Sequence, residues 1–193
     1  MSQIRRRHIG NKTGDGIILP TGYTKVDYVT NIYMKSIFFN NIGTNFEVFI
    51  DCAPHFTPLN DYGCIIGQNV SLQLGYNASG KASVGNSTSA KTFFEDKKRC
   101  EVYGCFSGTY ANTKYFVDGI DTGLHRACGS SREDICGNGA RGGANPCVLD
   151  IYSIRIIKDG VDIYHYIPCI RDSDNAKGLY DIVNNEFISN AFN

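Results

Sequence analysis

Short apolar and aromatic runs alternate with polar turn residues along most of the chain. Residues 47–50 (EVFI) and 70–74 (VSLQL) are typical runs, because β-branched, aromatic and leucine side chains are concentrated in them. Segments of this length and composition, bounded by Gly, Asn and Ser, are typical of β-strands. Little sequence between these runs suits a long helix, so the pattern predicts an all-β fold.

Two hairpins are predicted directly by Asp-Gly pairs. Residues 115–117 turn at Asp118-Gly119, and residues 151–157 turn at Asp159-Gly160 into a further apolar run. Asp-Gly supplies the positive φ angles that a two-residue type I′ turn requires. We therefore expect an antiparallel strand pair at each of these positions.

Between residues 126 and 146 the apolar pattern is lost. This segment is rich in Gly, Ser and Asn and contains few aliphatic residues. Such composition predicts a long surface loop, and long loops often carry binding residues. The candidate ligand residues in this loop are Arg132, Asn138, Arg141 and Asn145.

The length of 193 residues fits a single domain, which we place at residues 17–193. Nineteen Lys and Arg balance nineteen Asp and Glu, so no net field draws the protein to nucleic acid or to an anionic membrane. Residues 1–16 are the exception and form a basic N-terminal arm. Its candidate docking residues are Arg5, Arg6, Arg7 and His8. A solvated tail is the other interpretation of the same residues.

The sequence predicts neither a membrane span nor a disulfide framework. No apolar run approaches the roughly 20 residues of a membrane span, and the first residues lack the apolar centre of a signal peptide. We expect synthesis in a cytoplasm and eight mostly buried, reduced cysteines. Spacings such as Cys100 to Cys105 and Cys128 to Cys136 do not match structural zinc motifs, so no metal site is predicted.

Other short motifs do not match their catalytic or cofactor patterns. Residues 137–142 fit GxGxxG, but the flanking strand and helix of a dinucleotide site are missing, and no cofactor is predicted. Residues 172–175 begin like a calcium loop, yet Lys177 and Val183 replace the Gly and Glu of an EF-hand. A carbonyl-rich calcium loop remains an alternative there.

Charged clusters are assigned to the surface rather than to catalysis. Glu95 and Asp96 are predicted to lie in a solvated turn, and residues 132–134 in an exposed loop. Hydrolase motifs such as Gly-x-Ser-x-Gly and His-Glu-x-x-His are absent from the sequence.

Two stretches near the ends of the domain carry a family resemblance. They are residues 19–29 (LPTGYTKVDYV) and residues 167–187, which include IPCIRDSD and GLYDIVNNEF. The pair resembles the concanavalin A-like (laminin G-like) jelly-roll domains of gut-bacterial phages, including structural proteins of crAss-like phages. The resemblance implies a β-sandwich of antiparallel sheets, in which the opening stretch forms an outer strand and the closing stretch pairs beside it.

The same resemblance indicates binding rather than catalysis. Glucanases of this sandwich family carry Glu-x-Asp-x-Glu on one strand, and this triplet is absent here. Sugar recognition needs only polar loop groups and an aromatic platform, for which Tyr76, Tyr110 and Tyr115 are candidates. Core packing is the more common fate of tyrosines in such a fold.

We therefore expect a non-enzymatic structural protein of a phage virion, either an auxiliary capsid (decoration) protein or a head fibre. It would be assembled in the bacterial cytoplasm and would dock through its basic arm on the major capsid protein or on fibre subunits. The alternative is a carbohydrate- or receptor-binding module that recognises host surface glycans. A glycan hydrolase is a third hypothesis, which turnover of a polysaccharide would support.

Overall fold

The computed structural model describes the chain in segments, and these segments are built from β-strands. The described residues are 16–30, 37–40, 42, 44–56, 62–68, 71–85, 87–107, 109, 112–126, 132–135 and 147–189. They contain sixteen strands and no α-helix, which confirms the predicted all-β fold. The described part has no helix that is long and apolar enough to cross a bilayer.

Ten strands form the larger of two antiparallel sheets. They are β1 (Tyr23–Lys25), β2 (Val29–Thr30), β4 (Phe46–His55), β9 (Cys100–Phe106), β10 (Lys114–Val117), β11 (Ile120–Asp121), β13 (Val148–Lys158), β14 (Val161–Arg171), β15 (Ala176–Asp181) and β16 (Glu186–Ser189). The order in space is β11-β10-β9-β4-β13-β14-β15-β16, with β1 paired to β14 and β2 paired to β13.

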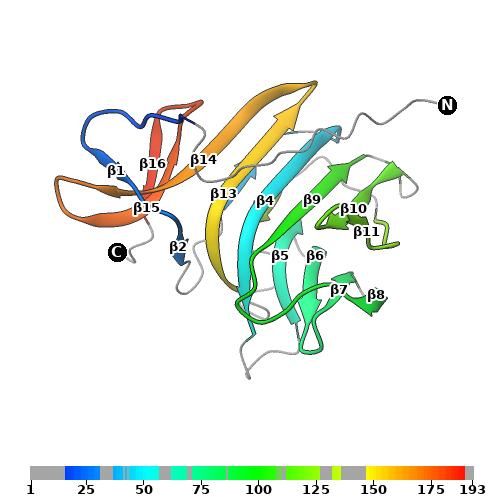
Figure 1. Cartoon of the computed structure of the whole chain (residues 1–193). Coiled ribbons are helices and arrows are strands. Elements are labelled where there is room, and N and C mark those ends of the chain that lie inside the picture. Colours follow the sequence, from blue (N-terminus) through cyan, green and yellow to red (C-terminus); the bar gives the residue numbers. More distant parts are fainter. Residues whose placement is uncertain are drawn as a thin grey trace.

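Six strands form the second sheet. They are β3 (Ile37–Asn40), β5 (Tyr62–Gln68), β6 (Ser71–Asn77), β7 (Lys81–Val84), β8 (Ser87–Thr92) and β12 (Arg132–Ile135). Their order is β3-β12-β5-β6-β7-β8. The second sheet lies behind one part of the larger sheet, whereas β1, β15 and β16 extend beyond it (Figure 1). The expected β-sandwich of antiparallel sheets is confirmed.

The core lies between the two sheets and follows the period of two in the sequence. Along β4, buried and partly exposed residues alternate from Phe46 to Cys52. Ile50 of β4 and Leu74 of β6 have no exposed surface. Alternate side chains of a strand point to opposite faces, so each buried residue implies an outward neighbour. The partly exposed residues of this alternation form the face of the larger sheet that points away from the core.

Both predicted hairpins are present. Asp118 and Gly119 have φ angles of 49° and 74° between β10 and β11. Asp159 and Gly160 have φ angles of 52° and 79° between β13 and β14. Both central residues of each turn are in the left-handed region, as a type I′ turn requires.

The two ends of the domain meet in one lobe, which we call the end lobe: β1, β15, β16 and the second half of β14. Tyr23 of β1 pairs with Arg171 of β14 in the strand register. The Tyr23 ring lies 4.6 Å from the Tyr180 ring and 5.5 Å from the Phe187 ring, centroid to centroid. The opening and closing stretches of the domain are therefore side by side.

The prediction of one long loop over residues 126–146 is wrong in part. Arg132–Ile135 form β12, which pairs with β3 on one side and with β5 on the other. The charged residues 132–134 are therefore in a strand and not in an exposed loop. Arg, Glu and Asp have no β preference, and the strand results from two flanking partners that the local sequence does not reveal.

Candidate functional site

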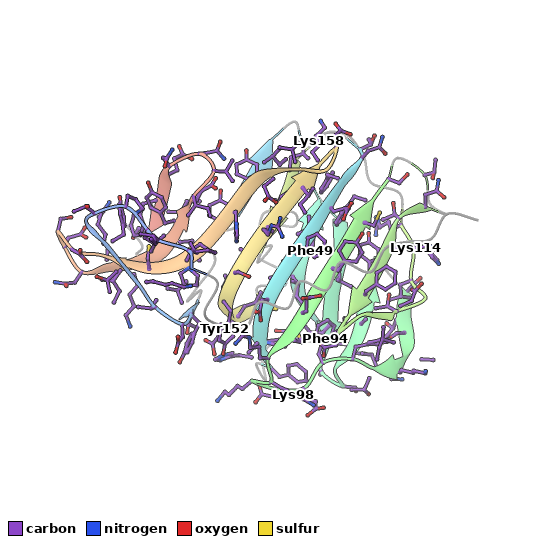
Figure 2. All side chains as sticks on the ribbon, turned by 45° about the horizontal axis from the view of Figure 1, so that its top comes forward. Phe49, Phe94, Lys98, Lys114, Tyr152 and Lys158 are labelled. Atoms are coloured by element: carbon purple, nitrogen blue, oxygen red, sulfur yellow. The ribbon has the colours of Figure 1, made fainter. Side chains whose placement is uncertain are left out.

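The larger sheet has a face that points away from the second sheet. In β4 this outward face carries Glu47, Phe49 and Asp51, which are partly exposed between buried neighbours. In β9 it carries Tyr103, and in β10 it carries Phe116. Figure 2 labels Phe49, Lys114 and Tyr152 on or beside the strands that form this face.

Three aromatic rings form a row across this face, here called the aromatic row. Strand register places Phe116 opposite Tyr103, and Tyr103 opposite Phe49. The ring centroids of Phe49 and Tyr103 are 4.6 Å apart, and those of Tyr103 and Phe116 are 5.4 Å apart. Because these rings are partly exposed, the row offers an apolar platform on an otherwise polar surface.

Charged and polar groups border the aromatic row. Arg155 is opposite Phe49 in the register, and its Nε and Nη2 each donate to a carboxylate oxygen of Asp162 at 2.9 Å. On the other side, the Tyr103 hydroxyl donates to Glu47 Oε2 at 3.3 Å. Bidentate pairing fixes the guanidinium plane. Its remaining N–H groups therefore point in defined directions.

The protonation states favour hydrogen bonding over nucleophilic chemistry. Burial raises the pKa of Tyr103 well above its usual range, and nearby Cys105 and Glu47 add to this effect. Burial also raises the pKa of the Cys105 thiol. Both groups therefore keep their protons at neutral pH, and neither is an activated nucleophile.

A second aromatic group, the tyrosine pair of Tyr28 and Tyr152, lies at one end of the outward face. Their ring centroids are 5.4 Å apart, and Tyr28 is 46% exposed. The guanidinium carbon of Arg99 lies 4.0 Å from the centre of the Tyr152 ring. Arg99 Nε and Nη2 also donate to Asp51 at 2.7 and 2.5 Å. Arg99 thus links the tyrosine pair to β4.

Two carboxylates face one another on the same surface. The register pairs Asp51 of β4 with Glu101 of β9. A retaining glycosidase uses two carboxyl groups separated by about 5 Å, one of which must be protonated to act as an acid. Both oxygens of Asp51 accept from the Arg99 guanidinium. This carboxylate is therefore already engaged in an ion pair.

The residues predicted to bind partners are mostly outside the described part of the chain. This applies to the arm residues Arg5, Arg6, Arg7 and His8, and to the loop residues Asn138, Arg141 and Asn145. Arg132 is described as the first residue of β12, where it pairs with Asn40. It belongs to the second sheet, and therefore not to the sheet that carries the aromatic row.

The tyrosines proposed as a sugar platform do not form one. Tyr76 is 4% exposed and Tyr115 is 0% exposed, so both belong to the core, while Tyr110 lies outside the described residues. The more general expectation of core packing is confirmed for these two. Glu95 and Asp96 lie in an exposed turn, as predicted.

The carboxylates in the turn between β14 and β15 accept hydrogen bonds from protein side chains. Asp174 accepts from Arg171 Nε and Nη2 at 3.0 and 2.6 Å, and Asp172 accepts from the Thr24 hydroxyl at 2.9 Å. Among the described residues, no group of three or more His, Cys, Asp and Glu is placed to hold a metal ion. This turn serves to join β1 to β14.

The aromatic row was missed because it depends on the register of strands distant in sequence. A local signal was nevertheless present. In β4, Phe49 is in phase with the charged residues Glu47 and Asp51, and in β9 Tyr103 is in phase with Glu101. An aromatic residue that shares a strand face with carboxylates is expected to point outward.

Comparisons with known proteins find structural likeness but no family. The chain matches no protein-family model and no curated protein. Among solved structures, it is similar to a native heptameric SAP-like pentraxin from Limulus polyphemus, with a TM-score of 0.36 and 11% identity. The match covers 68% of this chain and 70% of the pentraxin chain.

Proposed function

We propose that this chain is a non-enzymatic binding protein that recognises surface glycans through the outward face of its larger sheet. The aromatic row of Phe49, Tyr103 and Phe116 carries the proposal. Sugars present apolar C–H faces and a rim of hydroxyls, so they suit partly exposed rings bordered by oriented polar groups. The ion pair of Arg155 with Asp162 and the carboxylate of Glu47 supply such groups.

Binding is favoured over hydrolysis because Asp51, one of the two facing carboxylates, is held in an ion pair. A glycosidase needs one carboxyl group that holds a proton near neutral pH. Both carboxylate oxygens of Asp51 accept hydrogen bonds from Arg99, so this carboxylate is already occupied by an ion pair. The sequence also lacks the Glu-x-Asp-x-Glu triplet carried by glucanases of the sandwich family that it resembles.

We further propose that the protein acts on a phage particle as a decoration protein or head fibre. The support is the run Arg5–Arg7 with His8, together with the resemblance of residues 19–29 and 167–187 to phage jelly-roll domains. The basic arm would dock on capsid or fibre subunits, which would leave the sheet face free for glycans.

A glycan array tests the binding proposal directly. The wild-type chain is expected to bind a subset of bacterial surface glycans, and the double variant Phe49→Ala and Phe116→Ala is expected to lose that binding. Val183→Ala is the matched control, because Val183 is 40% exposed in the turn between β15 and β16 of the end lobe. Equal binding by the double variant and by the control would contradict the proposal.

The particle proposal has a separate test. Purified phage carrying the full chain should show ordered density for it on the capsid or fibres in electron cryo-microscopy. A chain without residues 1–16 should fold but should not be incorporated. Absence of the full-length protein from purified particles would exclude the virion role and would leave glycan binding to be judged alone.

A further inference from the structure

Cys52 and Cys100 are directly opposite one another on β4 and β9. We infer that they are a disulfide-forming pair, which closes when the protein leaves a reducing cytoplasm. Facing residues of antiparallel strands have Cα atoms roughly 4.5 or 5.5 Å apart. Disulfides accept Cα separations of about 4.4–6.8 Å. In this structure both residues are thiols.

The two side chains share one face of the sheet. Cys52 is 0% exposed and Cys100 is 7% exposed, and both belong to the core between the sheets. Facing residues of a strand pair project to the same side of the sheet, so both cysteine side chains point into the core from the same pair of facing positions. The strand pairing as it stands therefore brings both cysteine side chains to one position in the core.

Contacts on either side of the pair hold the register. Arg99, next to Cys100, donates to Asp51, next to Cys52, at 2.7 and 2.5 Å. Beyond the strand end, Lys97 N donates to Pro54 O at 2.7 Å, and Phe56 N donates to Asp96 Oδ1 at 2.7 Å. These bonds fix the backbone geometry on which a bridge depends.

The reaction needs an oxidant, for which we name a low-molecular-weight disulfide such as oxidised glutathione. The Cys100 thiolate, at the more exposed strand start, attacks one glutathione sulfur and releases one glutathione thiolate. The Cys52 thiolate then attacks the Cys100 sulfur of the mixed disulfide and releases the second glutathione. Two cysteine thiols lose two electrons and two protons, and one oxidised glutathione becomes two reduced molecules.

The bridge would join the two strands that supply the closest stack of the aromatic row. Phe49 and Tyr103 lie three residues from Cys52 and Cys100 along β4 and β9. The inference does not depend on glycan binding, because it rests on register and burial alone. A bridge between residues this far apart in sequence restricts the unfolded chain and should raise Tm by roughly 5–10 °C.

Cys64 and Cys147 form a rival pair. The Cys147 thiol donates to the Cys64 carbonyl oxygen at 2.7 Å, and both side chains are buried. They are not register partners, since Cys147 precedes β13 of the larger sheet and Cys64 is in β5 of the second sheet. A bridge between them would link the two sheets, whereas a Cys52–Cys100 bridge would link neighbouring strands of one sheet.

The test uses the purified full chain. Reduced protein is incubated with oxidised glutathione, remaining thiols are alkylated, and proteolytic peptides are identified by mass spectrometry. We expect one linked peptide pair that joins Cys52 to Cys100, together with the rise in Tm. The double variant Cys52→Ser and Cys100→Ser should lose both effects, whereas Cys64→Ser with Cys147→Ser should retain them.

The wild-type peptide map is decisive even if a serine variant fails to fold. Full alkylation of Cys52 and Cys100 after oxidation would overturn the inference. A linked peptide that joins either residue to another cysteine would overturn it as well.

Discussion

The ring of Tyr103 lies 4.6 Å from the ring of Phe49, centroid to centroid, and its hydroxyl donates to Glu47 at 3.3 Å. One side chain therefore takes part in both the apolar platform and its polar border. This dual role permits the two contributions to glycan binding to be separated by substitution.

We expect Tyr103→Ala to weaken glycan binding about tenfold, which corresponds to about 1.4 kcal/mol. Tyr103→Phe keeps the stack and loses only the hydroxyl, so its affinity should stay within about twofold and its stability within about 1 kcal/mol. Titration calorimetry and thermal unfolding measure both effects. Equal losses of affinity in Tyr103→Phe and Tyr103→Ala would show that the hydroxyl, and not the ring, contacts the ligand.

The carboxylate pair of Asp51 and Glu101 gives a prediction about catalysis. We expect no release of reducing ends from bacterial polysaccharides by the wild-type chain, because Asp51 is held by Arg99. Asp51→Asn and Glu101→Gln serve as the paired variants in the same assay. Turnover by the wild type that both substitutions abolish would establish a glycosidase instead.

Acid should weaken the end lobe through Asp174. The hydrogen bonds from Arg171 lower the pKa of Asp174 to about 2, below its usual value of 3.8. A depressed folded-state pKa adds stability at pH values above the unfolded-state pKa, and this stability is lost as the pH falls from about 4 to about 2. The Tm measured from pH 5 to pH 2 should therefore fall more steeply for the wild type than for Asp174→Asn. Parallel curves would contradict this linkage.

Any side chain at residue 178 should destabilise the pairing of β15 with β16. A Cβ built on Gly178 would lie 2.2 Å from the carbonyl oxygen of Ile188, a backbone atom of β16. The strand pair β15–β16 must shift to relieve this clash, and we expect Gly178→Ala to cost roughly 1–3 kcal/mol. Lys177→Ala on the same strand is the control, because Lys177 is exposed. Denaturant unfolding that places both variants within about 0.5 kcal/mol of each other would contradict the steric argument.

Features that depend on neighbouring residues in the chain could be predicted from sequence. The Asp159-Gly160 turn is one example, since its φ requirement is local. The pairing of Arg132–Ile135 between β3 and β5 is different, because its partners are far apart in sequence. The same limit applies to the aromatic row, which requires the registers of three strands. Tyr115 is buried and Tyr103 is partly exposed, although both lie in similar apolar runs of the sequence.

The end lobe determines how a mechanical load would enter the domain. A pull applied between residues 22 and 189 acts first on β1 and β16, which both contribute rings to the cluster around Tyr180. Tyr23 pairs with Arg171 and Ser189 pairs with Gly178, so both loaded residues lie at the same end of these strands. Tension therefore separates the hydrogen bonds of β1 one after another, starting opposite Arg171. The two-sheet core and the aromatic row are not in the direct path of that force. Such a load therefore opens the end lobe first, while the face that carries the aromatic row stays assembled.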